Sequence, residues 1–240
     1  SSSTWMQQRF IVSDAPVFDA IYHPDGERII TASQDGRMTV WDIETGEILQ
    51  STEHEITRLF SVSINPQGNL VANEAFGIVQ IWNLETDEVI ELFDETVEFF
   101  GTPVFTPDGT QLITKGSDNQ FHVWDVTDFT LQRTFGFDDG LFISAFDFSE
   151  DGSLLVSSSP NGTVKVWDFE TGELLADRFF TTDATINDAK LLADDQHILI
   201  SNAGSGVIVL WNWRSDEIVW TVNAATTSQG LAVSLDERYF

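Results

Sequence analysis

The chain has 240 residues, and 42% of them are hydrophobic, which is enough for a packed core and excludes a fully disordered protein. Its 39 acidic and 11 basic residues give a formal net charge of −28, which disfavours nucleic acid and anionic membranes as partners. Cysteine is absent, so disulfides, thiolate metal sites and cysteine nucleophiles are excluded. We expect no transmembrane segment, because no apolar run approaches about 18 residues.

The first well-defined pattern runs from about residue 17 to residue 49. Phe18, Ala20 and Tyr22 alternate with other residues and predict a strand, which Pro24-Asp25-Gly26 ends with a turn. The stretches 29–31, 38–41 and 48–49 predict three more strands, separated by turns at 35–36 and 44–47. The sequence therefore predicts four short antiparallel strands joined by tight turns.

This pattern recurs five times, at intervals of 41, 42, 43 and 44 residues between its tryptophans. Each tryptophan is followed by Asp or Asn, and the turn before its strand carries Asp at Asp35 and Asp118. The third place of the turn after it is Gly or Asp, which suits a positive φ, with Phe129 as the one exception. The repeated residues are Trp41, Asp42, Trp82, Asn83, Trp124, Asp125, Trp167, Asp168, Trp211 and Asn212.

A sheet of four short strands with two apolar faces needs neighbours on both sides to be stable. Stacking such sheets around an axis buries both faces, so we predict an all-β fold, a β-propeller of four-stranded antiparallel blades. Five blades are complete, and partial blades stand at both ends. The expected boundaries are 1–16 for the last strand of an incomplete blade, 17–55, 56–96, 97–140, 141–184 and 185–228 for the complete blades, and 229–240 for the start of another incomplete blade.

These residues resemble the WD-repeat family, whose blades carry Pro-Asp-Gly, Trp-Asp and Thr-Gly at these offsets. The resemblance implies a buried network of a histidine, a turn aspartate, a strand hydroxyl and the tryptophan. The histidine positions hold Ser13, Glu55, Thr96, Asp139 and Thr182, so the network is expected to be partial. The expected strand hydroxyls are Thr31, Thr114, Ser157 and Ser201, with Ala72 in their place once.

Motifs that carry catalysis or bind metals are scarce. His54-Glu55-Ile56-Thr57-Arg58 begins like a zinc-protease motif, but Arg58 stands where the second histidine is required. The four histidines fall at four different positions of the repeat, so they predict no metal cluster. We therefore expect no catalytic residues, no metal and no cofactor.

The resemblance to WD repeats places the connections between blades and the third turns at one end of the propeller. Aromatic residues with acids around them are typical of an interaction surface, and the acids would steer a basic partner. The alternative is that several of the phenylalanines pack between blades. The predicted partner-binding residues are Phe76, Phe99, Phe137, Asp138, Asp139, Phe180 and Asp183.

The sequence predicts a non-catalytic protein–protein interaction scaffold that is a segment of a larger repeat or multidomain protein. Its partners are other proteins, with basic ones favoured by the charge. The alternative is a structural subunit of a homo-oligomer or filament that self-associates through open propeller edges. A propeller enzyme ranks below both, and the sequence leaves the compartment open.

Overall fold

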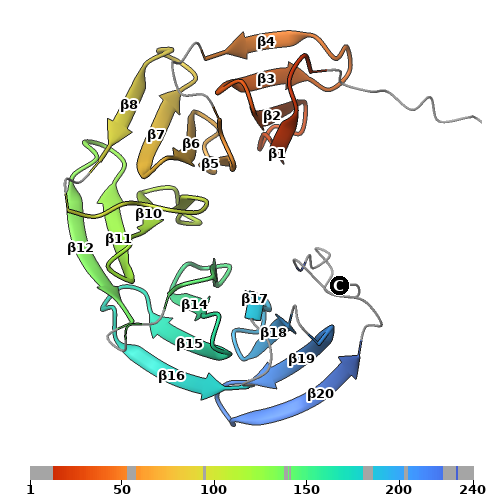
Figure 1. Ribbon diagram of the computed structural model, residues 1–240, viewed down its shortest axis with the longest axis vertical. Helices are drawn as coiled ribbons and strands as arrows, with labels where there is room; N and C mark the ends of the chain where they lie inside the picture. The colour runs from red at the N-terminus through yellow and green to blue at the C-terminus, as the bar shows by residue number, and fades with distance from the viewer. Residues whose placement is uncertain are drawn as a thin grey trace, which may run out of the picture. The chain divides into compact units, whose positions relative to one another are not determined.

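A computed structural model describes residues 13–52, 58–93, 96–137, 140, 142–180, 186–202, 205–223 and 231. Within these ranges the chain forms twenty strands and no helix, so it offers no helix that could cross a membrane. The strands form five four-stranded antiparallel sheets (Figure 1). This confirms the predicted all-β fold of propeller-type blades.

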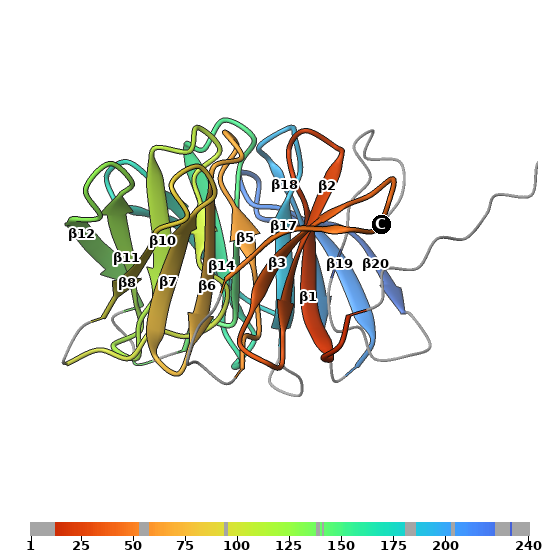
Figure 2. The same ribbon diagram turned by 90° about the horizontal axis from the view of Figure 1, so that it is seen from above.

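Neighbouring strands follow chain order in every sheet, as the first sheet shows in Figure 1, and Figure 2 gives a second view of the sheets, turned by 90°. The first sheet contains β1 (Val17–Tyr22), β2 (Arg28–Ser33), β3 (Met38–Asp42) and β4 (Ile48–Ser51). The second contains β5 (Ser63–Ile64), β6 (Leu70–Ala75), β7 (Ile78–Asn83) and β8 (Val89–Leu92). The third contains β9 (Val104–Phe105), β10 (Gln111–Lys115), β11 (Gln120–Asp125) and β12 (Leu131–Gly136).

The fourth sheet contains β13 (Ala145–Phe148), β14 (Leu154–Ser158), β15 (Thr163–Asp168) and β16 (Leu174–Phe179). The fifth contains β17 (Ile186–Leu191), β18 (His197–Asn202), β19 (Val207–Asn212) and β20 (Glu217–Asn223). The division into blades at the predicted residue boundaries stays a prediction. Of the expected partial blades, residues 1–12, 229–230 and 232–240 lie outside the described residues.

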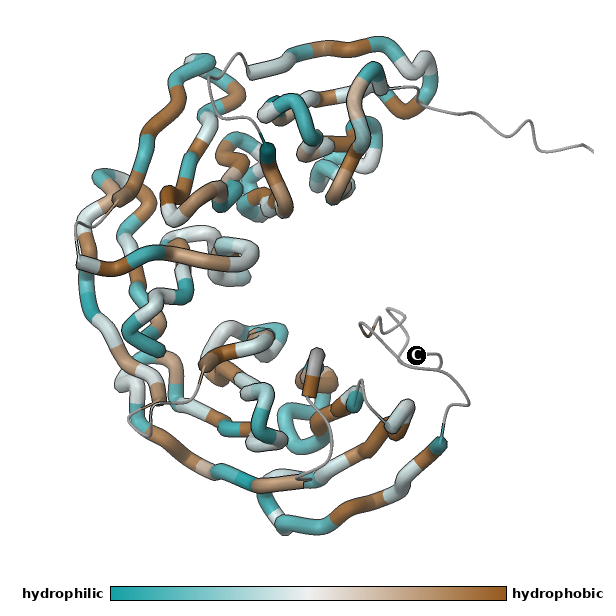
Figure 3. The backbone as a smooth tube through the Cα atoms, in the orientation of Figure 1, coloured by the Kyte–Doolittle hydropathy of each residue, from teal (hydrophilic) through white to brown (hydrophobic). Residues whose placement is uncertain are grey.

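The chain divides into two compact units, residues 1–105 with 112–114 and residues 106–111 with 115–240. In each unit, apolar side chains of one sheet pack against those of the next, as the alternating hydrophobic and hydrophilic stretches of the strands allow (Figure 3). The first core joins Met38 and Val40 of β3 to Val71 and Trp82 of the second sheet. The second core joins Val164 and Val166 of β15 to residues of the fifth sheet that include Ile198, Ile200 and Trp211.

The buried tryptophans find hydrogen-bond acceptors in two ways. In the first and fourth sheets the indole Nε1 donates to a hydroxyl on the second strand, 2.8 Å away at Thr31 and 2.8 Å away at Ser157. In the second sheet Trp82 Nε1 instead donates to Asp87 Oδ1 at 2.9 Å. In the fifth sheet Trp211 Nε1 donates to Asp216 Oδ1 at 3.2 Å.

The expectation that Ser201 bonds to Trp211 is therefore wrong, and the cause is hairpin length. On the second strand of each sheet, one residue lies directly opposite the tryptophan. Two positions after that residue stands Thr31 in the first sheet, Asn73 in the second and Ile200 in the fifth. The β6–β7 hairpin is one residue shorter than the β2–β3 hairpin, and the β18–β19 hairpin is one residue longer. A shift of one residue turns each side chain to the opposite face of its strand.

The turns after the tryptophan strands adopt the predicted backbone conformation in all five sheets. Gly46, Gly172, Asp87 and Asp216 have positive φ, between 57° and 73°. Phe129, the exception by residue type, also has a positive φ of 54°. The fold therefore holds Phe129 in a backbone conformation with positive φ, which bulky residues rarely adopt.

Hydrogen bonds from equivalent positions tie successive sheets together within each unit. The carboxylate of Asp19 on β1 accepts the Val62 N–H at 2.9 Å. In the second unit Asp147 on β13 accepts the Leu191 N–H of β17 at 3.3 Å, and Asp188 on β17 likewise accepts the Leu231 N–H at 2.9 Å. Such bonds fix the register of one repeat against the next.

Candidate interaction surface

Three exposed phenylalanines of the first unit form a contiguous aromatic cluster. Phe18 lies on β1, Phe60 precedes β5, and Phe76 lies in the turn between β6 and β7. Their exposed fractions are 43%, 47% and 67%. The ring centroids lie 5.7 Å apart for Phe18 and Phe60 and 6.5 Å apart for Phe60 and Phe76. Exposed apolar side chains in mutual contact mark an interaction site more strongly than scattered ones.

Arg58 completes this aromatic cluster. Its guanidinium carbon lies 5.1 Å from the centroid of the Phe18 ring and 5.5 Å from that of Phe60, which is cation–π distance. Among the described residues no carboxylate pairs with Arg58, although the chain carries 39 acidic residues. The guanidinium is therefore available for a contact with a partner.

A tight turn and a side-chain hydrogen bond fix the backbone at Phe76. Residues Ala75 and Ile78 pair across a two-residue turn, in which Phe76 and Gly77 have φ of 54° and 84°. Such a turn with two positive φ angles matches the twist of an antiparallel hairpin. Glu74 Oε1 accepts the Gly77 N–H at 3.0 Å, which holds the turn that presents the Phe76 ring.

The predicted partner-binding residues fall into four groups. Phe76 is exposed and belongs to the cluster. Phe99 and Phe137 are each only 2% exposed, because they pack in the interior, so burial removes them from the candidate surface. Phe180 is half-buried, with its ring centroid 5.3 Å from that of Trp211. Asp138, Asp139 and Asp183 lie outside the described residues.

Sequence reasoning missed Phe18, Phe60 and Arg58 as surface residues. The sequence pattern identifies Phe18 only as an apolar residue of a strand. The structure shows that its ring is exposed and lies beside that of Phe60. Arg58 takes the place of the second histidine in an incomplete zinc-protease pattern, which gives no signal for an interaction site. The proximity of Arg58 and Phe60 in sequence was the one available hint.

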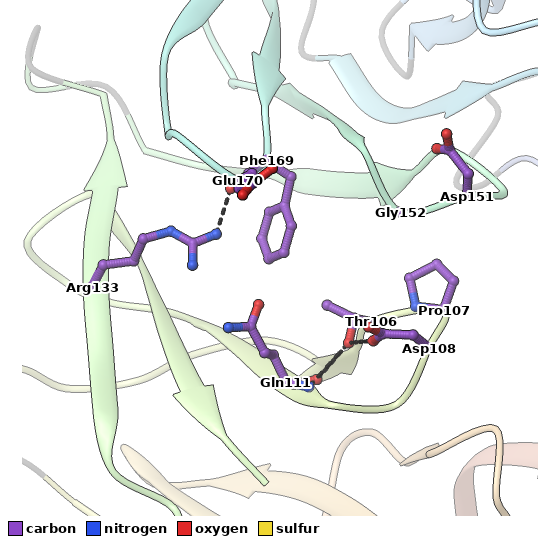
Figure 4. Close-up of a pocket in the computed structure, with 9 residues that line it drawn as sticks. All are labelled: Thr106, Pro107, Asp108, Gln111, Arg133, Asp151, Gly152, Phe169 and Glu170. Atoms are coloured by element: carbon purple, nitrogen blue, oxygen red, sulfur yellow. Dashed lines mark hydrogen bonds between the residues drawn. The ribbon is translucent and has the colours of Figure 1, made fainter.

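A polar pocket of about 210 Å³ lies in the second unit, between the third-sheet turn at 106–111 and the fourth sheet (Figure 4). Arg133 of β12 reaches across it and donates from Nη2 to the Phe169 carbonyl oxygen. Its guanidinium carbon lies 4.7 Å from the centroid of the Phe169 ring. In the first unit Gln50 of β4 makes the equivalent bond to the Leu84 carbonyl oxygen, at 3.0 Å.

Two of the three carboxylates that line this pocket, Asp108 and Asp151, are held by hydrogen bonds within their own turns. Burial raises the pKa of Asp108, but hydrogen bonds from Thr106 and Thr110 outweigh it and hold the pKa below its ordinary value. Hydrogen bonds from Ser153 and Ser149 lower the pKa of Asp151. Both carboxylates are ionised at neutral pH and bound within their own turns. At this pocket the contacts of Arg133 with Phe169 join the third and fourth sheets.

The described part of the chain brings together no group of three histidine or acidic side chains that could hold a metal ion. His122 is bound to Asp118, with Nε2 to Oδ2 at 3.0 Å, and His23 Nε2 lies 2.7 Å from the Gly68 carbonyl oxygen. These histidines take part in contacts that hold turns and neighbouring sheets.

Comparison with known proteins agrees with the repeated sheets and tryptophans. The family model described as WD domain, G-beta repeat, matches residues 6–42 and 129–168. These two segments of the chain therefore match WD repeats. Both matched segments end just after a tryptophan, Trp41 or Trp167, whose indole donates to a strand hydroxyl.

The chain is similar to several curated proteins. It is 25% identical over 192 residues to a guanine nucleotide-binding protein subunit beta of Nicotiana tabacum, covering 74% of this chain and 51% of the relative. It is 26% identical to the echinoderm microtubule-associated protein-like 3 of Mus musculus, covering 67% of this chain and 18% of the relative. It is 27% identical to the target of rapamycin complex subunit LST8 of Bos taurus, covering 52% and 41%. The chain spans about half the length of the G-protein beta relatives that it matches.

Proposed function

We propose that this WD-repeat chain is a non-catalytic scaffold that binds partner proteins through the aromatic cluster of Phe18, Phe60, Phe76 and Arg58. The observation that carries the proposal is a chain of three exposed rings in contact, two of which also lie against a guanidinium that no described carboxylate neutralises. Aromatic side chains, phenylalanine included, and arginine are enriched in protein–protein interfaces relative to the rest of the surface. Two relatives support this function, because their names describe subunits of assemblies.

The charge of the chain favours partners with a basic surface. A net charge of −28 attracts cationic proteins over a distance set by the ionic strength. Steering by charge acts mainly on the association rate, whereas the aromatic cluster supplies buried contact area. The association rate of basic partners should therefore be higher at low salt, and the aromatic cluster should determine their dissociation rate.

The experiment uses a pair of matched substitutions. Phe76→Asn removes a ring of the cluster while keeping a residue that tolerates positive φ. Phe129→Asn makes the same change at a turn with the same φ of 54°, in the second unit. The wild type, both variants and Arg58→Ala are immobilised, and proteins captured from an extract of the source organism are quantified.

The proposal expects at least one protein that binds the wild type and Phe129→Asn but is depleted on both Phe76→Asn and Arg58→Ala. Its purified form should then show the same ranking in a direct binding titration. If every captured protein binds all four forms equally, the cluster is not the binding surface.

A second candidate function is a structural subunit that self-associates at the fifth sheet. Met38 and Val40 of β3 are fully buried, whereas the equivalent Ile208 and Leu210 of β19 are only half-buried. Concentration-dependent association measured by sedimentation, and its loss on removal of residues 1–16, would favour this candidate. A mass that stays constant with concentration speaks against it.

A further inference from the structure

A second, apolar pocket of about 400 Å³ lies in the second unit at the junction of the fourth and fifth sheets. Its apolar walls come from Phe180, Ile186, Ile200, Val207, Val209 and Ile218. Ile186 and Ile200 are almost fully buried, whereas Ser205 and Thr221 lie exposed at its rim. A pocket of this size with apolar walls and a few polar groups is typical of a small-ligand site.

The preceding junction explains why the pocket exists. Two residues before each tryptophan, β15 carries Lys165 and β19 carries Val209. Lys165 is buried, and its Nζ lies 4.2 Å from the centroid of the Phe137 ring. Phe137 packs on Trp167 as Phe180 packs on Trp211, with centroid distances of 5.8 and 5.3 Å.

The cross-strand partners differ in the same way. Lys165 lies opposite Asp177 on β16, and Val209 lies opposite Thr221 on β20. Valine and threonine are shorter than lysine and aspartate, so they leave unfilled the space beside Phe180 that Lys165 fills beside Phe137. The fifth sheet thus exchanges a charged pair for a neutral, shorter one, and a pocket opens.

We propose that this pocket binds a neutral apolar group of about the size of an aromatic ring system. None of its described lining residues is charged, in a chain whose net charge is −28. A charged ligand would lose its hydration there without gaining an ion pair, whereas an apolar ligand gains from leaving water. Asn202, Ser205 and Thr221 offer neutral hydrogen-bonding groups that would orient it.

The probe for this site is N-phenyl-1-naphthylamine, a neutral apolar dye whose fluorescence rises on burial. The wild type should bind it saturably with one site. Val209→Phe fills the pocket, and Val209→Lys with Thr221→Asp restores the pair found in the fourth sheet. Each should weaken dye binding by roughly tenfold or more, the loss of about 1.4 kcal/mol of binding free energy. Thermal unfolding and circular dichroism check that each variant is folded.

Ile48→Ser is the matched control, because it removes an exposed apolar side chain from the first unit and leaves the pocket intact. It should bind the dye as the wild type does. If N-acetyl-tryptophan amide displaces the dye, the natural occupant of the pocket is an aromatic side chain of a partner protein. If the dye binds and the amide does not displace it, the natural occupant is a free small molecule. Absence of saturable binding, or equal binding by a folded pocket variant, overturns the proposal. Neither result depends on the aromatic cluster of the first unit.

Discussion

A tryptophan inside a sheet stack brings a donor that must find an acceptor, because a buried N–H left without one costs about 1–3 kcal/mol. This chain meets the requirement with paired residues. Where the second strand offers Thr31 or Ser157, the following turn holds Gly46 or Gly172. Where the second strand offers Asn73 or Ile200, the turn holds Asp87 or Asp216. The carboxylate of that aspartate accepts the hydrogen bond from the indole Nε1.

Asp87→Gly should destabilise the protein by about 1–2 kcal/mol. The substitution leaves Trp82 Nε1 without an acceptor, and the glycine's ease at positive φ offsets part of that cost. Urea unfolding followed by tryptophan fluorescence measures the change. Asp87→Asn, which keeps an acceptor oxygen and tolerates the same φ, should lie close to the wild type.

The double variant Asp87→Gly with Asn73→Thr tests the pairing directly. It recreates in the second sheet the hydroxyl and glycine of the first, and it should recover most of the lost stability. If the double variant is as unstable as the sum of its two single variants, the exchange of acceptors is not the reason for the pairing.

At the scale of strands and turns, the sequence was informative wherever a local pattern decides the structure. Alternating apolar residues and the Gly, Pro and Asp turns predicted the four-stranded sheets. The positive φ of Phe129 shows that the turn geometry overrides the preference of its residue. The acceptors of Trp82 and Trp211 were not predictable from a fixed offset, because hairpins of different length change which side chain faces the indole.

The candidate surface was less predictable for the same kind of reason. The exposure of an aromatic side chain depends on whether a neighbouring sheet covers it. The alternation of apolar and polar residues along a strand does not predict this packing. Phe76 and Phe99 are both aromatic residues near turns, yet one is 67% exposed and the other 2%. Contact between Phe18 and Phe60 joins residues 42 positions apart, which only the packing of two sheets brings together.

Arg133→Ala should destabilise the second unit by about 1–2 kcal/mol. It removes both the hydrogen bond to the Phe169 carbonyl oxygen and the stacking of the guanidinium on the Phe169 ring. Burial lowers the pKa of Arg133, while Glu170 and Asp168 raise it and help to hold the charge. Denaturant midpoints measured for wild type and variant give the difference.

Arg133→Gln is the informative comparison, because Gln50 makes the same bond in the first unit without a guanidinium. It should fall between wild type and Arg133→Ala. If glutamine matches arginine, stacking contributes little, and if it matches alanine, the hydrogen bond contributes little.

For the whole molecule, charge is the property that most sets this chain apart. With 39 acidic and 11 basic residues, like charges repel across the folded surface. Raising NaCl from about 0.01 M to about 0.15 M shortens the screening distance from about 30 Å to about 8 Å. The melting temperature should therefore rise over this range.

Sucrose at matched osmolality is the control, since it stabilises compact states without screening charge. It should not reproduce the steep rise at low salt. A melting temperature that falls as NaCl is added would show that local ion pairs, such as Arg28 with Asp25, outweigh the general repulsion.

The variable hairpin between the second and third strands has a consequence for how such repeats change over time. Loss or gain of one codon there leaves the sheet paired but exchanges the side chain beneath the indole. An aspartate in the next turn then supplies the hydrogen-bond acceptor for the indole, as Asp87 and Asp216 do. Repeated units of this kind can thus tolerate small insertions and deletions in this hairpin while they keep the same four-stranded sheet.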